Sequence, residues 1–141
     1  MALMVSLAGC TTTPWQDKHR QEIRRIFVHE PAGSFTDEMK RCGEAAHDSA
    51  VRGLRKLGYQ DAVEEAGADA TLEGAWVPET ELSKDGRARV TLRIMLRARG
   101  GKVLFTTQVA QGTLLSFLSK DRVAEETGRM IAELGKAPLV R

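Results

Sequence analysis

The sequence predicts a single α+β domain in which one four-stranded mixed sheet is covered on one face by two helices. Three observations predict this class: a long stretch in which apolar and polar residues alternate, an amphipathic stripe typical of a long helix, and glycine-containing turns between apolar runs. In chain order the elements follow the pattern β-α-β-β-β-α. A sheet with one apolar face needs a cover there, so we expect both helices on that face.

The chain begins with an apolar run, residues 1–10, that ends in small residues. The run is too short to span a bilayer as a helix and is typical of a secretory signal with its cleavage site. Its last four residues, Leu-Ala-Gly-Cys, resemble the lipobox of bacterial lipoproteins, which are cut before a diacylated cysteine. The resemblance implies lipidation of Cys10. Thr11 stands where lipoproteins of the inner membrane often carry Asp, which implies sorting to the outer membrane.

The domain boundaries follow from this leader. We expect a lipoprotein signal peptide at 1–10, a polar tether at 11–22 and the α+β domain at 23–136. No Lys or Arg precedes the apolar run, so we expect the translation start to lie further upstream; the alternative is a disordered apolar N-terminus. With Cys10 lipidated, Cys42 is the one remaining thiol, and no internal disulfide can form.

The first strand is predicted at 23–29, where it is ended by a proline and a glycine. It can lie beside either edge of the later strands, because a right-handed crossover allows both places. Ser34 or Thr36 can cap the helix that follows, and Gly58 stops it. The residues of its apolar stripe recur at steps of three or four; they are Phe35, Met39, Cys42, Ala46, Ala50, Leu54 and Leu57.

Four small residues, Gly43, Ala46, Ala50 and Gly53, make part of this helix slim. Such a slim side permits close approach to a sheet. The alternative is a seam between two helices of a dimer.

Residues 87–99 spell Arg-Ala-Arg-Val-Thr-Leu-Arg-Ile-Met-Leu-Arg-Ala-Arg. Successive side chains of a strand point to opposite faces, so this stretch predicts one long strand with an apolar face and an arginine face. A helix would scatter the arginines around its circumference. The two glycines that follow are a two-residue hairpin signal, and pairing Arg99 with Lys102 places the apolar residues of the next strand on the same face.

The strand before this stretch is predicted at 69–77. A two-residue Asp-Gly turn would put Trp76 on the arginine face. A three-residue loop with Gly86 in the left-handed conformation of a G1 bulge puts it on the apolar face instead. We therefore expect a three-stranded meander at 69–77, 87–98 and 102–112.

This register places acidic residues across from two of the arginines. Glu73 faces Arg97, and Glu81 faces Arg89. Opposite charges directly across a strand pair contribute about 0.2–1 kcal/mol each.

Three arginines, Arg87, Arg93 and Arg99, face no acidic residue in this register, and they are the candidates for binding an anion or a partner. Arginine suits planar, bidentate recognition of carboxylate and phosphate groups. The alternative is an ordinary solvated sheet surface. Nucleic acid is a poor fit, because aromatic residues are not interleaved with the basic ones and the formal net charge is only +2.

A second helix is predicted to begin after Ser119 and to close at Gly135. Like the first helix, it carries one apolar stripe, which is expected to face the sheet. The stripe consists of Val123, Thr127, Met130, Ile131 and Leu134.

The sequence offers no constellation for catalysis or metal binding. His19, His29 and His47 are scattered, and no Cys, His and carboxylate cluster has metal-ligand spacing. Cys42 lies on the buried stripe, where we expect an inert small hydrophobe rather than a nucleophile. We therefore expect no enzyme activity, no metal and no cofactor.

A lipobox, a tether, a strand and a capped helix ending in Leu57-Gly58-Tyr59 precede the sequence Ala-Asp-Ala-Thr-Leu-Glu-Gly at 68–74. This order resembles a group of small outer-membrane lipoproteins. The group includes the lipopolysaccharide-assembly lipoproteins, the activators of penicillin-binding proteins and the periplasmic domain of the curli-secretion lipoprotein. Its pattern is a Gly-aromatic pair after the helix, followed by an Ala-Asp…Leu-x-Gly strand. The resemblance implies a sheet backed by helices.

The resemblance also implies a function. We expect a non-catalytic adaptor, anchored in the outer membrane by lipid and facing the periplasm, that binds an envelope protein or an anionic polymer. One alternative is a soluble binding module whose basic sheet face contacts nucleic acid. Another is a dimerising surface lipoprotein that uses the small residues of the first helix.

Overall fold

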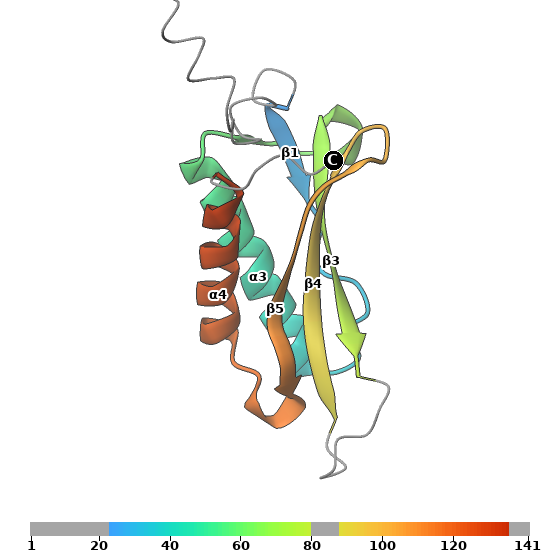
Figure 1. The fold of residues 1–141 in the computed structure, drawn as a ribbon, viewed down its shortest axis with the longest axis vertical. Helices are drawn as coiled ribbons and strands as arrows, with labels where there is room; N and C mark the ends of the chain where they lie inside the picture. The colour runs from blue at the N-terminus through green and yellow to red at the C-terminus, as the bar shows by residue number, and fades with distance from the viewer. Residues whose placement is uncertain (1–22, 80–87, 136–141) are drawn as a thin grey trace, which may run out of the picture.

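The computed structural model describes residues 23–79 and 88–135, which form a five-stranded sheet with two helices on one face (Figure 1). The sheet order is β2-β1-β3-β4-β5. The elements are β1 (Arg25–Val28), α3 (Asp37–Lys56), β2 (Gln60–Asp61), the 3-10 helix η1 (Glu65–Gly67), β3 (Ala70–Pro78), β4 (Arg89–Ala98), β5 (Val103–Leu114), the 3-10 helix η2 (Leu115–Phe117) and α4 (Lys120–Leu134). The predicted α+β class and the placement of both helices are confirmed.

The predicted number of strands, four, is wrong because β2 adds a fifth. After α3 the chain pairs in parallel with β1, where the Gln60 N–H donates to Arg24 O at 2.8 Å and the Ala62 N–H to Ile26 O at 3.1 Å. A strand of two residues is too short to show a periodicity, so it could not be predicted from the sequence. On its other side β1 pairs in parallel with β3, so β1 lies beside the β3 edge of the meander and not beside the β5 edge.

The β3–β4 pair has the predicted faces but not the predicted register. Leu72 lies opposite Leu96, and Glu73 lies opposite Met95 rather than Arg97. The observed pairing differs from the expected one by two residues, and a shift of two leaves every side chain on its face. The expected loop with Gly86 lies outside the described residues.

The β4–β5 hairpin combines a correct register with a different turn. Leu96 pairs with Phe105 as expected, but the loop has three residues rather than two. The Ala98 N–H donates to Lys102 O, the Gly101 N–H donates to Ala98 O, each at 2.8 Å, and Gly101 has a φ of +97°. This is a turn with a left-handed third residue, and a register shift beyond Leu96 absorbs the extra residue.

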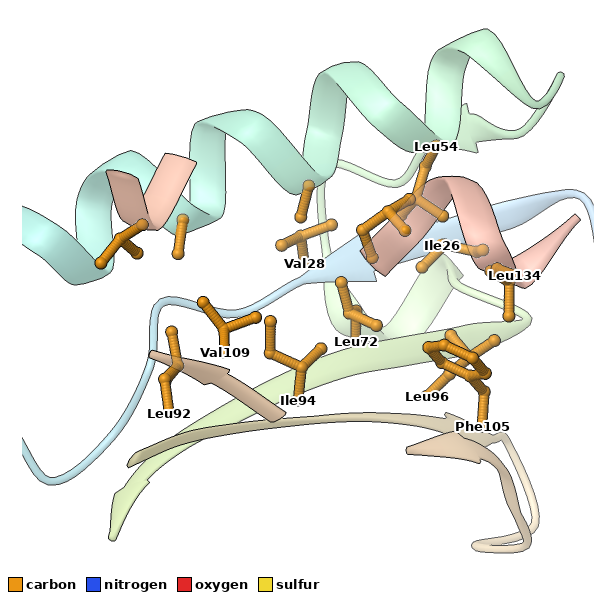
Figure 2. Packing of buried hydrophobic residues seen from close by; sticks show 14 of the residues in the cluster. Ile26, Val28, Leu54, Leu72, Leu92, Ile94, Leu96, Phe105, Val109 and Leu134 are labelled. Carbon is orange, nitrogen blue, oxygen red and sulfur yellow. The ribbon is translucent and has the colours of Figure 1, made fainter. Parts of the chain in front are cut away.

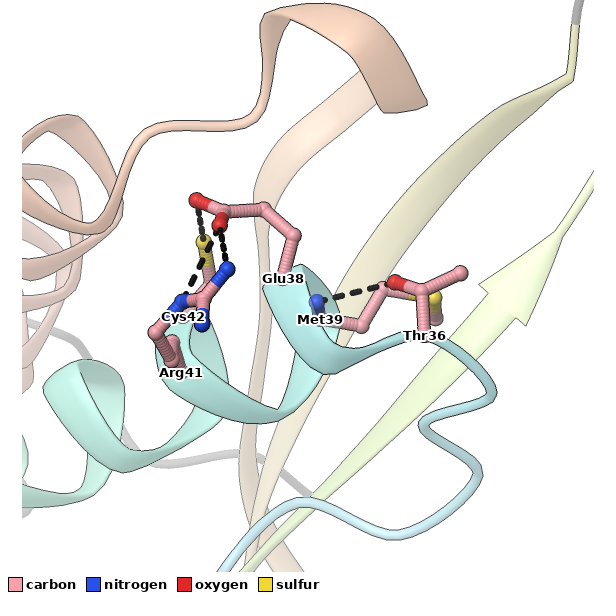
Figure 3. Close-up of polar contacts among 5 residues, drawn as sticks. All are labelled: Thr36, Glu38, Met39, Arg41 and Cys42. Carbon is pink, nitrogen blue, oxygen red and sulfur yellow. Dashed lines mark hydrogen bonds and ion pairs between the residues drawn. The ribbon is translucent and has the colours of Figure 1, made fainter.

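The ends of α3 are set by specific hydrogen bonds. Thr36 Oγ1 accepts from the Met39 N–H at 3.0 Å, so Thr36 rather than Ser34 is the cap (Figure 3). At the other end Gly58 takes a φ of +99°, and the Tyr59 N–H donates to Leu54 O at 3.0 Å. These are the features of a Schellman motif, which turns the chain towards β2.

The core lies between the sheet and the helices (Figure 2). The predicted stripe of α3 is buried except at its ends: Leu57 is half-buried and Phe35 is 58% exposed. Phe35 precedes the cap and so does not share the helical periodicity. In α4, Ser119 is the cap as predicted, and the stripe is buried apart from the partly exposed Met130.

The small residues of α3 bring it close to α4 as well as to the sheet side of the domain. A Cβ on Gly53 would lie 2.9 Å from Ile131 Cγ2, and Ser49 Oγ donates to Ala124 O at 2.6 Å. A Cβ on Gly43 would lie 3.4 Å from Pro31 Cδ. The slim side therefore serves packing within the domain, and at Gly53 the neighbour is a helix rather than the expected sheet.

The Gly53 contact makes a stability prediction. Gly53→Val should lower the free energy of unfolding by about 1–3 kcal/mol, because the added atoms overlap Ile131 in a packed contact. Thermal or urea unfolding measures the change. Arg52→Val is the control for the helix propensity of valine, since Arg52 is exposed on the same turn. Equal effects of the two changes would show that α3 and α4 can separate at this point.

Candidate functional site

The face of the sheet turned away from the helices carries the arginines of β4. We call it the open face. Its described residues come from four strands and alternate with the buried ones. They include Phe27, His29, Thr71, Glu73, Ala75, Arg93, Met95, Arg97, Thr106 and Gln108.

Two arginines near the β4–β5 turn are held by the domain itself. Arg97 Nε lies 3.3 Å from Glu73 Oε1, and its Nη1 donates to Gly101 O at 2.9 Å. Arg99 donates from Nη2 and Nε to Ala68 O at 2.7 and 3.1 Å. Its Nη2 also lies 3.9 Å from Asp69 Oδ1.

These contacts correct the candidate set. The expectation that Arg99 faces no acidic residue is wrong, because the β3–β4 pairing is shifted by two residues from the expected register and brings Asp69 beside Arg99. The pairing of Arg97 with Glu73 is confirmed as an ion pair, although the two are diagonal neighbours rather than opposite. Arg87 lies outside the described residues.

Arg93 remains as the candidate that the described structure leaves open. It is exposed and lies opposite Ala75 on β3 and Gln108 on β5. It makes no hydrogen bond or ion pair with another described residue. The short side chain of Ala75 leaves the guanidinium group accessible from the solvent side.

A shallow hollow of about 430 Å³ lies beside Arg93 on the open face. Its wall carries both basic and acidic side chains: two arginines, three glutamates and one histidine. Two of the lining residues contact each other, with His29 Nε2 at 3.5 Å from Glu65 Oε1. The lining residues are His29, Glu30, Ala32, Glu65, Glu73, Gly74, Ala75, Arg93, Met95 and Arg97.

The hollow could not be identified from the sequence. Glu65 belongs to η1, a short 3-10 helix without periodicity, and only the parallel pairing of β1 with β3 brings His29 beside the open face. The charge count also changes the expectation of a basic surface. In the hollow the glutamates outnumber the arginines, so this part of the open face has a mixed charge.

The buried cysteine does not add a reactive group. Cys42 is fully buried in α3, and its Sγ lies 3.8 Å from Glu38 Oε1 (Figure 3). Burial, together with the neighbouring Glu38 carboxylate, raises the pKa of the thiol to about 11. The group is therefore a neutral thiol at physiological pH and a poor nucleophile, as expected from its place on the stripe.

Asp69 acts as a structural clamp next to the open face. Its Oδ2 accepts from the backbone N–H groups of Arg24 and Arg25 at 2.9 and 3.0 Å. These hydrogen bonds, with a smaller contribution from the charge of Arg99, lower the pKa of the Asp69 carboxyl below its usual value. The residue thus joins the starts of β1 and β3 to the β4–β5 turn.

This clamp makes a pH-dependent prediction. Because the folded pKa of Asp69 is lowered, its stabilising effect is present above the pKa of the unfolded carboxyl, about 3.9, and is lost as the pH falls through the folded value. Asp69→Asn should therefore lower the melting temperature at pH 7 and have a smaller effect near pH 3. Glu44→Gln, an exposed change on α3, is the control. An Asp69→Asn effect that is equal at both pH values would contradict the assignment.

The motif residues behind the lipoprotein resemblance also have structural roles. Gly58 ends α3 in the left-handed conformation, and Tyr59 is buried. A Cβ on Gly74 would lie 3.2 Å from Pro31 Cβ and Cγ, so the position requires glycine or a shift of the proline. Together with the hydrogen bonds of Asp69, these structural roles explain why the Gly-aromatic pair and the Ala-Asp…Leu-x-Gly strand occur in this fold.

Two familiar kinds of site are absent from residues 23–79 and 88–135. No set of three or more His, Cys, Asp and Glu side chains in these residues is placed to hold a metal ion. No helix in the same part of the chain has the length and apolar character needed to cross a membrane.

The described residues thus define an α+β domain with helices on one face of the sheet and an open, charged second face. Among solved structures, this fold is similar to a PelC dodecamer from Paraburkholderia phytofirmans that carries one leucine-to-methionine substitution, with a TM-score of 0.51, 18% sequence identity, and coverage of 79% of this chain and 87% of that one. A PelC dodecamer from the same organism in space group P6 gives a TM-score of 0.48 at 18% identity, covering 82% of this chain and 89% of that one.

No protein-family model matches the chain, and no curated protein matches it either. At 18% identity the likeness to PelC shows the fold alone.

Proposed function

We propose that the protein is a non-catalytic cell-envelope adaptor, anchored to the outer membrane through lipid on Cys10, that binds a carboxylate-bearing segment of an envelope protein through its open face. The observation that carries the proposal is Arg93: it is exposed, lies on the face that the helices leave uncovered, and has no partner among the described residues. Arginine in such a place can bind a carboxylate through two parallel hydrogen bonds.

The mixed charge around Arg93 favours a protein over an anionic polymer. A polymer with an acidic group on every unit would meet Glu30, Glu65 and Glu73 as well as the arginine, and like charges repel at these short distances. A protein segment can present one carboxylate to Arg93 and neutral or basic side chains to the glutamates. Specificity then comes from charge complementarity rather than from net charge.

The anchor supports the adaptor proposal from the sequence side. A tether of residues 11–22 can reach about 3.3–3.6 Å per residue when extended. It would hold the domain within a few tens of ångströms of the membrane and leave the open face free to turn towards a partner. Lipidation in this proposal supplies location, and the open face supplies recognition.

We also propose that the protein self-associates. The PelC protein with the similar fold is a dodecamer, and we extend to this chain only the expectation of a homo-oligomer. Several copies on one membrane would present several Arg93 side chains to a partner, which strengthens binding through multivalency.

Charge reversal tests the recognition step. Lipidated protein carrying Arg93→Glu should recover less of its partner from crosslinked envelopes than the unchanged protein, because the partner's carboxylate would meet a second carboxylate. Arg129→Glu is the matched control, since Arg129 is exposed on α4, on the other side of the domain. Equal recovery by both variants would overturn the proposed role of Arg93.

The same variants separate the two kinds of ligand. Purified protein is mixed with polygalacturonate, a carboxylated polymer, or with polyphosphate, and binding is measured at low and high salt. Under the adaptor proposal we expect weak binding that Arg93→Glu does not change. Tight, salt-sensitive binding that Arg93→Glu abolishes would assign the open face to an anionic polymer instead.

A further inference from the structure

β5 forms an outer edge of the sheet. Among the strands that the structure describes, it pairs only with β4. An edge strand has one row of backbone N–H and C=O groups without a partner strand, and such a row can pair with another chain.

The hydrogen bonds of the neighbouring strands show which residues of β5 carry this outer row. The Glu79 N–H donates to Arg89 O and the Arg99 N–H to Asp69 O, so odd-numbered residues of β4 turn their backbone groups towards β3. Even-numbered residues of β4 therefore turn towards β5, where they meet Phe105, Thr107 and Val109. The N–H and C=O groups of Thr106 and Gln108 consequently point away from the sheet.

The composition of β5 does nothing to block pairing at this edge. Natural sheets protect long edges with charged side chains or proline. The twelve residues of β5 read Val-Leu-Phe-Thr-Thr-Gln-Val-Ala-Gln-Gly-Thr-Leu and contain neither. The edge formed by β2 is different, because β2 has only two residues and one of them is Asp61.

Two irregular places limit the regular part of the edge. The register shifts between Leu96 and Arg97 and again between Val90 and Leu92. At the second shift Ala110 has a φ of +54° and Gly112 a φ of +61°, and the Gly112 N–H donates to Thr91 Oγ1 at 2.9 Å. The regular edge therefore runs over residues 105–109.

We propose that two copies of this chain pair antiparallel through β5, with Thr107 at the centre and Thr106 of one copy opposite the partner's Gln108. This inference rests on the proposed self-association and names its contact. A strand without charge can pair with its own copy without like-charge repulsion. The two-fold contact uses the same surface of both copies and is closed, and the short β2 edge does not continue it.

The pairing has a consequence for the open face. The two sheets become one continuous sheet, and the open faces of the two copies lie on the same side. Arg93 of one copy is separated from that of the other by three strand spacings, because each Arg93 lies one strand inside its edge. With about 4.8 Å per spacing and an offset of two residues, about 6.8 Å, along the strands, the two Arg93 sites lie about 16 Å apart.

A lysine at either edge tests the inference. Gln108→Lys places a charge on the regular edge of β5, and Gln60→Lys places the same change on the β2 edge. The full chain with Cys10→Ala, which avoids lipid micelles, is measured by sedimentation velocity over a range of concentrations. We expect Gln108→Lys to raise the dimer dissociation constant by about tenfold or more and Gln60→Lys to leave it unchanged. Thermal melting shows whether both variants remain folded.

Cysteine crosslinking tests the register. In the Cys10→Ala chain, one preparation carries Thr106→Cys and another Gln108→Cys, and the two are mixed under mild oxidation. We expect a disulfide-linked dimer in the mixture and much less in either preparation alone, since residues directly opposite across a strand pair have the Cα separation that disulfides need. Efficient crosslinking of either preparation alone would overturn this register.

The remaining outcomes are distinct. If oligomers form and tolerate Gln108→Lys, the contact is elsewhere and the β5 inference fails while self-association stands. If both lysine variants dissociate the oligomer, β5 of one copy pairs with β2 of the next, which contradicts the two-fold contact. If the unchanged chain is a monomer throughout, both the inference and the proposed self-association fail.

Discussion

Cys10→Ala should abolish palmitate labelling of the protein and move it from the detergent phase to the aqueous phase. The expected acyl chains are attached at this one residue, and in the proposal they supply the affinity for the membrane. The protein is expressed with its full upstream leader, labelled with radioactive palmitate and separated by detergent partition. The expected loss is complete, because alanine at position 10 has no thiol to carry the lipid.

Cys42→Ala is the matched control for this experiment. Cys42 is buried within α3, so its removal should leave labelling and partition unchanged. Equal labelling of the Cys10→Ala variant and the unchanged protein would contradict the lipobox assignment and with it the proposed localisation.

Leu96→Ala should destabilise the domain strongly, by about 2–5 kcal/mol, which is the usual cost of truncating a buried leucine. The side chain of Leu96 is completely buried on the apolar face of β4, opposite Leu72 and Phe105 (Figure 2). A loss of this size is a large part of the stability of a small domain. Urea unfolding followed by circular dichroism measures it.

Met95→Ala is the neighbouring control. Met95 points to the open face and is only partly buried, so its loss should cost much less than that of Leu96. If both changes had the same cost, the two faces of β4 would be equally buried. That result would contradict the two-layer arrangement.

The faces of β4 could be predicted because they depend only on alternation along one strand. Val90, Leu92, Ile94 and Leu96 are all buried as expected. Register depends on how loops close, and the sequence predicts loop closure less well than it predicts the faces of a strand. Two adjacent glycines permit more than one hairpin, and the chain forms a three-residue loop that ends at Gly101.

Phe35 shows where helical periodicity misleads. It continues the spacing of the buried stripe, but the helix begins after Thr36. Outside the helix, this spacing no longer determines which way a side chain points. The side chain is therefore exposed. The stripe could be predicted within α3, and its first member could not, because only the cap decides where the periodicity starts.

The candidate site was predicted in part. Alternation placed Arg93 on the face away from the helices, where it lies in the structure. The partner of Arg99 could not be predicted, because the β3–β4 register depends on how the two strands meet in the fold: it lies two residues from the expected one and places Asp69 beside Arg99. The hollow was missed for the same reason: Glu65 comes from a short segment whose place depends on tertiary contacts.

A photo-crosslinking residue at position 75 tests most directly whether the open face docks onto an envelope protein. Ala75 is exposed and lies opposite Arg93, whereas Ala132 is exposed on α4 and serves as the control position. The lipidated protein is irradiated in living cells, and crosslinked species are separated by mass. We expect a discrete crosslink to an envelope protein from position 75, lost with Arg93→Glu, and none from position 132. A crosslink from position 132 alone would contradict docking through the open face.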